Sequence, residues 1–299
     1  MTTTATPPAG STGPAGPGRR PRPASPVIRM GRRSSALLVV VTLVGFVAFT
    51  WPLFTHPHGS ENLAHSSDAP WLFVLVLPLL LAIVLSELAD GTLDSKAVAV
   101  LGVLAACGAA VRLPSGGVTG FAPIFFLLLP AGRVYGRGFG FVLGALTMFA
   151  SALLTGGVGP WLPYEMFGMA WVGFFAGCLP RASGHAEITL LGVYGFVAGL
   201  AYGLLLNLWF WPFAVSGDNA TAFVAGAPLG ENLRRFLAFD IATSLGFDLP
   251  RAVTNLVLVV VMGRPVLVVL RRAARRASFG IRPTFGSAAE VAAVPPTPA

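Results

Sequence analysis

Eight runs of apolar residues, separated by more polar segments, constrain the fold of this chain more than any other feature. A helix needs about 20 predominantly apolar residues to cross the hydrocarbon core of a bilayer. Lipid offers the backbone no hydrogen-bond partners, so a spanning segment of this kind has to be helical. Only 11% of the residues are charged, whereas soluble domains carry about 25%. The sequence therefore predicts an all-α polytopic membrane protein with about eight transmembrane helices.

The apolar runs form two groups along the chain. Residues 36–93 contain the first two and are expected to form an N-terminal transmembrane hairpin, while residues 94–272 contain six more and are expected to form the membrane core. The flanking segments 1–35 and 273–299 have too few apolar groups to offset the entropy of ordering, so we expect disordered cytoplasmic tails. The eight predicted spans are 36–54, 71–88, 97–113, 120–132, 138–155, 163–179, 188–213 and 249–270.

The distribution of basic residues predicts the orientation. Eight spans place both termini on one side of the membrane. With that side cytoplasmic, sixteen of the 20 Lys and Arg lie inside, as the positive-inside rule requires. The four outside are Arg112, Arg234, Arg235 and Arg251. The net charge of +8 then reflects topology, because nucleic-acid binding needs basic residues clustered on a soluble face. We expect a multi-pass protein of the plasma membrane, with both termini cytoplasmic and no nucleic-acid partner.

Polar and aromatic side chains gather where the chain is expected to reach the outer face. A loop broken by glycine and proline, residues 156–162, leads directly to Glu165 at the start of an apolar run. An ionisable residue at membrane depth is costly and therefore marks a functional site. The residues expected to bind a ligand are Arg112, Trp161, Tyr164, Glu165, Asn207, Trp209 and Asp240.

Other roles stay open for these residues. Tryptophan and tyrosine are also enriched at membrane interfaces, where they form an aromatic belt. Arg234, Arg235 and Arg251 are alternatively expected to pair with nearby carboxylates or lipid head groups. Residues 231–247 have helical spacing but are too polar for an ordinary span, so they predict an interfacial or partly re-entrant helix over the outer mouth.

Small residues recur at four-residue spacing on several predicted helices. They are Gly102, Ala106 and Ala110; Gly195, Gly199 and Gly203; and Gly173 and Gly177. In lipid, small residues at this spacing allow helix backbones to approach closely. Two interpretations stay open for each stripe: packing within the chain, or docking onto another membrane subunit.

The sequence lacks the motifs of nucleotide-using and hydrolytic enzymes. Lys96 is the one lysine, and the chain contains neither a Walker A loop, a Gly-x-Ser-x-Gly elbow nor a His-Glu-x-x-His pair. His56, His58 and His65 share one predicted loop, which we interpret as a solvated loop rather than a metal site. We therefore expect no catalytic residue, no cofactor and no bound metal.

Five segments of the predicted core carry a resemblance to a known family. They are the alanine-rich residues 97–112, Leu128-Leu-Pro-Ala-Gly-Arg-Val-Tyr-Gly, Leu153-Leu-Thr-Gly-Gly-Val-Gly-Pro-Trp-Leu-Pro, Asn207-Leu-Trp-Phe-Trp-Pro and Glu231-Asn-Leu-Arg-Arg-Phe. Together they resemble the substrate-binding S component of energy-coupling factor (ECF) transporters of the actinobacterial type. The six spans of residues 94–272 agree with that family's core, and the two N-terminal spans depart from it.

The resemblance implies a membrane protein that captures a vitamin or related micronutrient on the outer side. It implies association with a transmembrane coupling (T) subunit and two ABC ATPases, which supply the energy. The family's Ala-x-x-x-Ala docking surface corresponds here to Gly102, Ala106 and Ala110. Cobalamin is the favoured substrate, and riboflavin, thiamine or a modified base precursor stay open.

Two functions from other classes also stay open. One is a self-sufficient secondary transporter or channel. The other is an intramembrane enzyme with Glu165 or Asp240 as a general base, although the sequence shows no recognisable nucleophile or set of metal ligands.

Overall fold

The regular structure of the described chain is helical throughout. The computed structural model describes residues 32–50, 53, 95–113, 123–159, 161–215 and 219–277. These residues form α1 (Arg32–Thr50), α3 (Ser95–Arg112), α4 (Ile124–Tyr135), α5 (Arg137–Thr155), α6 (Leu162–Cys178), α7 (His185–Ala214), α8 (Leu229–Thr243) and α9 (Leu245–Ala277). The all-helical fold class is thus confirmed for this part of the chain. The loop with the three histidines, the predicted span 71–88 and most of both predicted tails lie outside the described residues.

Among the described residues, three helices are long and apolar enough to cross a membrane. They are Arg137–Thr155, His185–Ala214 and Leu245–Arg276, and the shorter segments Ser35–Thr50 and Ile124–Tyr135 are also apolar. The three helices have 19, 30 and 32 residues, so each reaches or exceeds the roughly 17–25 residues that a bilayer core requires. Membrane insertion is supported by these helices, whereas the number of spans and their orientation stay predictions.

The helix bounds follow the apolar runs, with differences at polar ends. α1 begins at Arg32 and α9 continues to Ala277, so both helices extend into segments predicted as tails. Arginine has good helix propensity and a long side chain that reaches away from lipid, so a basic segment can continue a helix. The predicted interfacial helix 231–247 corresponds to α8, which ends at Thr243 and is separated from α9 by Ser244.

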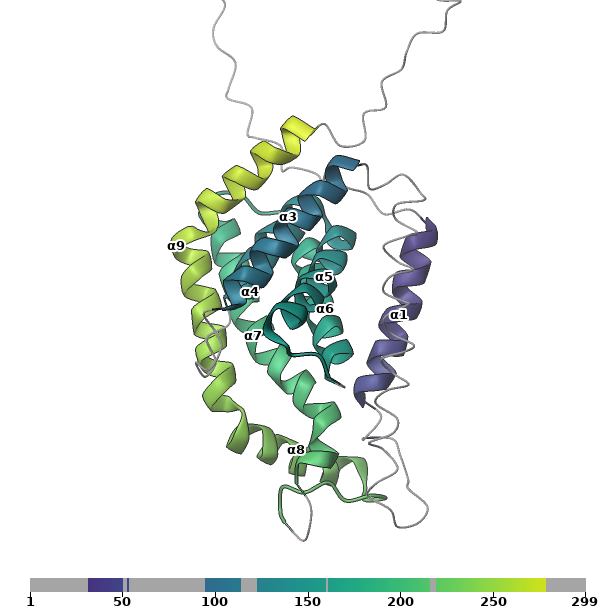
Figure 1. Ribbon diagram of the computed structural model, residues 1–299. Helices are drawn as coiled ribbons and strands as arrows, with labels where there is room; N and C mark the ends of the chain where they lie inside the picture. Colours follow the sequence, from purple (N-terminus) through teal and green to yellow (C-terminus); the bar gives the residue numbers. More distant parts are fainter. Residues whose placement is uncertain are drawn as a thin grey trace, which may run out of the picture.

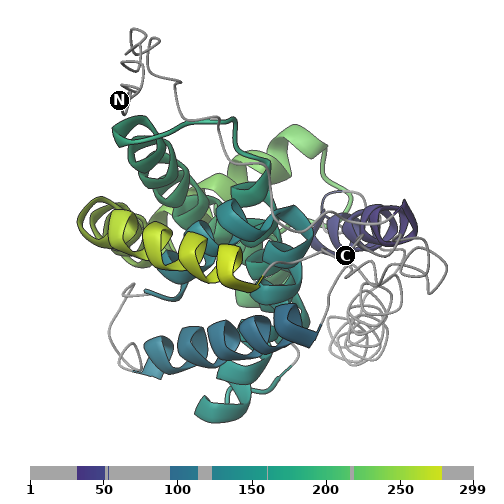
Figure 2. The same ribbon diagram turned by 90° about the horizontal axis from the view of Figure 1, so that it is seen from above.

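The helices pack into one bundle, in which α3 and α9 are tilted relative to the other helices (Figures 1 and 2). In Figure 1, α7 passes through the bundle, α9 lies on one side, α1 lies on the opposite side, and α8 lies near the lower end. Figure 2, the view from above, also places α9 and α1 on opposite sides, with α3 along a third side. The last residue of α7 and the first residue of α9 therefore lie at the end of the bundle where α8 lies.

Two of the predicted glycine stripes pack inside the chain. A Cβ atom on Gly140 of α5 would collide with the carbonyl oxygen of Gly173 on α6, and the reverse substitution meets the same obstacle. On the other side of the bundle, a Cβ atom on Gly199 of α7 would lie 2.9 Å from the Cα of Ala252 on α9. Such contacts allow close approach of helix backbones where lipid supplies little hydrophobic drive for association.

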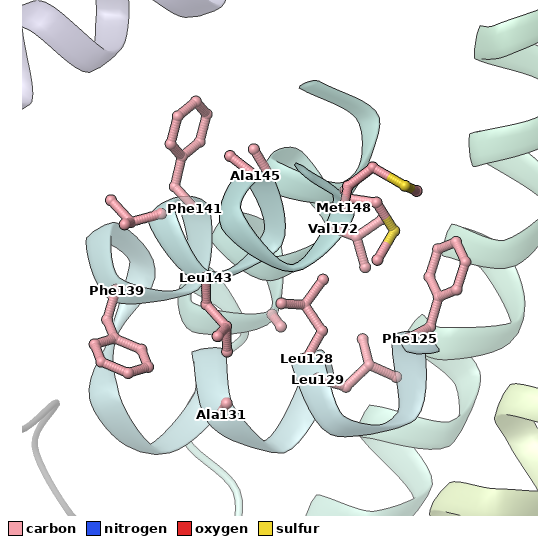
Figure 3. Packing of buried hydrophobic residues seen from close by; sticks show 14 of the residues in the cluster. Phe125, Leu128, Leu129, Ala131, Phe139, Phe141, Leu143, Ala145, Met148 and Val172 are labelled. Carbon is pink, nitrogen blue, oxygen red and sulfur yellow. The ribbon is translucent and has the colours of Figure 1, made fainter. Parts of the chain in front are cut away.

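Large apolar side chains from α4, α5 and α6 fill the centre of the bundle. Leu129 and Phe141 are fully buried, and Figure 3 shows them in one cluster with residues from the neighbouring helices. The cluster extends along α5 to Met148, which is 2% exposed. The sulfur of Met148 then contacts the first polar side chains of the candidate site, described next.

Candidate functional site

An ion pair between Arg112 and Glu165 joins the end of α3 to the start of α6. The Arg112 Nη2 atom lies 3.7 Å from Glu165 Oε1, and the two side chains are 29% and 19% exposed. Arg112 occupies the last turn of its helix and Glu165 the first turn of its own. These are the positions where a cation and an anion complement the helix dipole. Each charge therefore lies at the helix end that stabilises it, and the packing of the helices in the bundle brings the two side chains together.

The Arg112 guanidinium is also held by α5. Its Nη1 atom donates to Ser151 Oγ at 3.3 Å and contacts Met148 Sδ at 3.0 Å. Ser151 is fully buried, so its hydroxyl needs a partner inside the protein. Three helices therefore fix the position of this cation.

A second arginine, Arg251 of α9, also acts on this carboxylate. Electrostatic attraction acts on Glu165 from both Arg112 and Arg251. The Arg251 guanidinium lies 5.3 Å from the centroid of the Tyr202 ring, within cation–π range. Glu165 is thus attracted by cations of α3 and α9, and the buried Tyr202 of α7 lies beside Arg251.

Asp248 balances the charge of Arg251. Arg251 Nη1 donates to Asp248 Oδ1 at 2.7 Å and to the carbonyl oxygen of Gly199 at 3.2 Å. The Asp248 carboxylate lies directly over Gly203, where a Cβ atom would collide with it. The glycines of α7 therefore leave room for the polar face of α9. The pairing confirms the alternative in which Arg251 binds a nearby carboxylate.

Two predicted aromatic residues stack on each other. The rings of Tyr164 and Trp209 have centroids 4.1 Å apart and an interplanar angle of 3°. Tyr164 is 3% exposed and Trp209 is 8% exposed, so an interfacial belt does not account for either ring. Trp161 differs, because it is 46% exposed and donates from Nε1 to the carbonyl oxygen of Gly157 in its own loop.

A third contact joins α7 to the segment around α8. Asn207 Nδ2 donates to Asp240 Oδ1 at 2.6 Å and to Ser244 Oγ at 2.5 Å. The structure therefore brings the predicted residues together in pairs: Arg112 with Glu165, Tyr164 with Trp209, and Asn207 with Asp240. Tyr164 and Glu165 are consecutive residues in the first turn of α6, so both of the first two pairs involve the start of that helix.

The set of residues predicted to bind a ligand did not include Tyr202, Asp248 or Arg251, although Arg251 was expected to pair with a nearby carboxylate. Asp248 and Arg251 share one face of α9 because they are three residues apart, and that spacing is the signal that sequence offers. Tyr202 carries no comparable signal, because its position beside Arg251 depends on how α7 and α9 pack.

A separate charged cluster at the opposite end of the bundle was also missed. Glu187 of α7 accepts hydrogen bonds at Oε1 from Arg133 Nε at 2.9 Å and from Arg271 Nη2 at 2.6 Å. Its side chain is only 3% exposed. Arg133 also donates to the carbonyl oxygen of Leu179 at 2.8 Å, next to the end of α6. This cluster joins α4, α7 and α9 and anchors the connection between α6 and α7.

The small-residue stripe of α3 faces outward, unlike the glycines of α6 and α7. Gly102, Ala106 and Ala110 are exposed, and a Cβ atom added to Gly102 would meet no atom within 4 Å. The opposite face of α3 packs on α5 through Gly108, where a Cβ atom would lie 2.6 Å from Thr147 Cγ2. Within the described residues, internal packing therefore does not account for the outward stripe.

Neither a metal site among the described residues nor a match to a known protein indicates a function. Across residues 32–50, 53, 95–113, 123–159, 161–215 and 219–277, no group of three or more His, Cys, Asp or Glu is arranged to hold a metal ion. No protein-family model, curated protein or solved structure matches the chain. The cluster around Glu165 and the open face of α3 are therefore the two structural features that bear on function.

Proposed function

We propose that this protein is the substrate-specific component of an ECF-type importer, which captures a vitamin or related micronutrient at the α8 end of the bundle. The observation that carries the proposal is the Glu165 cluster. Its carboxylate is attracted by arginines of two other helices, and the residue before it is the stacked Tyr164. Ionisable groups inside a membrane protein commonly mark the path or binding site of a substrate.

The geometry of the cluster favours binding of a polar ligand group. The Arg112–Glu165 separation of 3.7 Å exceeds the about 2.7–2.9 Å of a charge-assisted hydrogen bond. Neither group is fully buried, and a guanidinium has five N–H donors. A hydroxyl, amide or carboxyl group of a ligand then gains hydrogen bonds from Arg112 or Glu165 without first breaking a tight pair. The adjacent aromatic rings of Tyr164 and Trp209 supply apolar contact surface.

The open face of α3 supports a partner within the membrane. Gly102, Ala106 and Ala110 present a flat surface, and small residues allow another helix to approach closely. We propose the transmembrane coupling (T) subunit as this partner, with two ABC ATPases completing the complex. The absence of a Walker A sequence from the chain agrees with ATP hydrolysis by other subunits.

Basic residues support an orientation with the α8 end outside. α9 ends in a segment with Arg271, Arg272, Arg275 and Arg276, at the end of the bundle opposite α8. Cytoplasmic segments carry an excess of Lys and Arg. The Glu165 cluster then faces the outer side of the plasma membrane. Cobalamin is our favoured substrate on the sequence resemblance, with riboflavin, thiamine and a modified base precursor as the other candidates.

Reconstitution into liposomes tests this proposal against the alternative of a self-sufficient secondary transporter or channel. The protein alone is expected to bind substrate without accumulating it, with or without an ion gradient. Addition of the coupling subunit, the two ATPases and ATP is expected to start uptake. Uptake by the isolated protein, driven by an ion gradient, would contradict the proposal and establish secondary transport.

A further inference from the structure

The N-terminal helix α1 contacts the aromatic pair of the candidate site. Phe49 is fully buried, and its ring centroid lies 5.1 Å from that of Tyr164 at an interplanar angle of 76°. Edge-to-face contacts of this kind are favoured because the positive edge of one ring meets the negative face of the other. The Tyr164 ring therefore contacts both the Phe49 ring, edge to face, and the parallel ring of Trp209.

The seating of α1 on α6 involves a specific face of the helix. A Cβ atom on Gly45 would lie 3.0 Å from Phe167 and 3.2 Å from Trp171, so this glycine is in contact with two rings. Trp171 Nε1 donates to Thr42 Oγ1 at 3.5 Å. Residues 42, 45 and 49 are spaced as one face of a helix, and that face meets α6.

The rest of the α1 surface includes apolar side chains that are exposed. Phe46 is 55% exposed and Val47 is 65% exposed. If α1 served only as a hydrophobic anchor in lipid, these exposed side chains would be sufficient. The buried contact of Phe49 with Tyr164 is an additional feature, since it connects the helix to a residue directly beside Glu165.

We infer that Phe49 is a positioning residue of the ligand site, which holds the Tyr164 ring against Trp209. The inference rests on the proposed function. The edge-to-face contact with Phe49 restrains the Tyr164 ring in the orientation in which it stacks on Trp209. α1 then forms a wall of the site.

Fluorine NMR of the full-length protein containing 5-fluorotryptophan tests the role of Phe49 without any ligand. The protein has six tryptophans, and replacement of Trp209 by Phe identifies the Trp209 resonance. Phe49→Leu, which keeps an apolar side chain, and Phe49→Ala are both expected to shift that resonance by loosening the Tyr164 ring above it. Phe46→Ala is the matched control at an exposed position and is expected to leave the resonance in place.

A double-mutant comparison separates positioning from general loosening of the bundle. In a Tyr164→Ala background, Phe49→Leu is expected to leave the Trp209 resonance unmoved, because the ring that transmits the effect is gone. An unmoved resonance in Phe49→Leu alone would overturn the positioning role. An equal shift with and without Tyr164 would overturn it as well.

The contribution of Phe49 to ligand binding is tested by mass spectrometry of small molecules that co-purify with the protein. The co-purifying molecule is expected to be retained about tenfold less by Phe49→Ala than by Phe46→Ala, a difference of about 1.4 kcal/mol in binding free energy. Equal retention by the two variants would overturn the role of Phe49 in the ligand site and leave the proposed function standing. Failure to recover any molecule would count against the proposed function, while the fluorine result would still decide the role of Phe49.

Discussion

The guanidinium of Arg112 lies 3.7 Å from the carboxylate of Glu165, so the last turn of α3 faces the first turn of α6. The same relationship recurs at the opposite end of the bundle, where Arg133 in the last turn of α4 meets Glu187 in the first turn of α7. Each pair places a cation and an anion where the helix dipoles favour them. The Arg112–Glu165 pair is more exposed than the Arg133–Glu187 pair. The more exposed pair is therefore the candidate ligand site, and the buried pair has a structural role.

Removal of the Arg112 charge is expected to weaken the bundle moderately. Arg112→Gln leaves Glu165 with Arg251 as the nearby cation and deprives Ser151 of a charged donor. The expected loss of unfolding free energy is about 1–3 kcal/mol, measured as a fall in the thermal unfolding temperature in detergent. Arg234→Gln, an exposed arginine of α8, is the control and is expected to change that temperature little. Equal effects of the two substitutions would contradict the Arg112 contacts.

Glu187→Gln is expected to destabilise the protein more strongly than any single change at the Glu165 cluster. The substitution leaves Arg133 and Arg271 facing each other without their shared carboxylate. Loss of one member of a buried ion pair costs about 3–5 kcal/mol. Glu231→Gln removes a partly exposed carboxylate that pairs with Arg235 within α8, where the expected cost is about 0–1 kcal/mol. The thermal unfolding temperatures of the two variants are measured under the same conditions. Similar temperatures would contradict a stabilising role for the Glu187 ion pairs.

Gly173→Ala is expected to disrupt the contact between α5 and α6. The new methyl group has to displace the backbone of Gly140, since a Cβ atom there collides with its carbonyl oxygen. Overpacking of this kind costs about 1–3 kcal/mol. Gly102→Ala adds a methyl group at a helical position with open space around it and is expected to be neutral or slightly stabilising. Unfolding temperatures that fall equally for both variants would contradict the close approach of the two helices.

Much of the fold could be predicted from the sequence, because apolar runs and their breaks follow from local composition. α5, α6 and α7 each begin and end within three residues of the predicted spans. The start of α1 and the end of α9 were harder to predict, because an arginine-rich segment can either continue a helix or lie outside it. The span 71–88 lies outside the described residues and stays a prediction.

The candidate site was predicted as a set of residues and not as a set of contacts. The free-energy cost of burying a charged or polar group marked Glu165 and Asn207 as site residues, and both have polar partners in the structure. The partners themselves depend on which helices are adjacent, which a single sequence does not reveal. The contact between Phe49 and Tyr164 is the clearest case, because an aromatic residue in an apolar run has no feature that distinguishes it from its neighbours.

Docking of the coupling subunit is expected to depend on the open face of α3. Ala106→Leu places a larger side chain on that face, so co-purification with the coupling subunit is expected to fall by at least about tenfold, equivalent to about 1.4 kcal/mol. Ala201→Leu is the control, an exposed alanine of α7, and is expected to leave co-purification unchanged. Substrate binding by the isolated protein should survive both changes. Unchanged co-purification of Ala106→Leu would show that the partner, if present, uses another surface.

The most direct test of the account is mass spectrometry of the small molecules bound to the protein purified alone, compared with its Glu165→Gln and Glu231→Gln variants. A vitamin-class molecule is expected to be bound to the unmodified protein. The Glu165→Gln variant is expected to retain about tenfold less of this molecule, which corresponds to about 1.4 kcal/mol of binding free energy. The Glu231→Gln variant is expected to retain an unchanged amount. No bound molecule in the unmodified protein, or equal amounts in all three, would contradict the assignment of a ligand site to the Glu165 cluster.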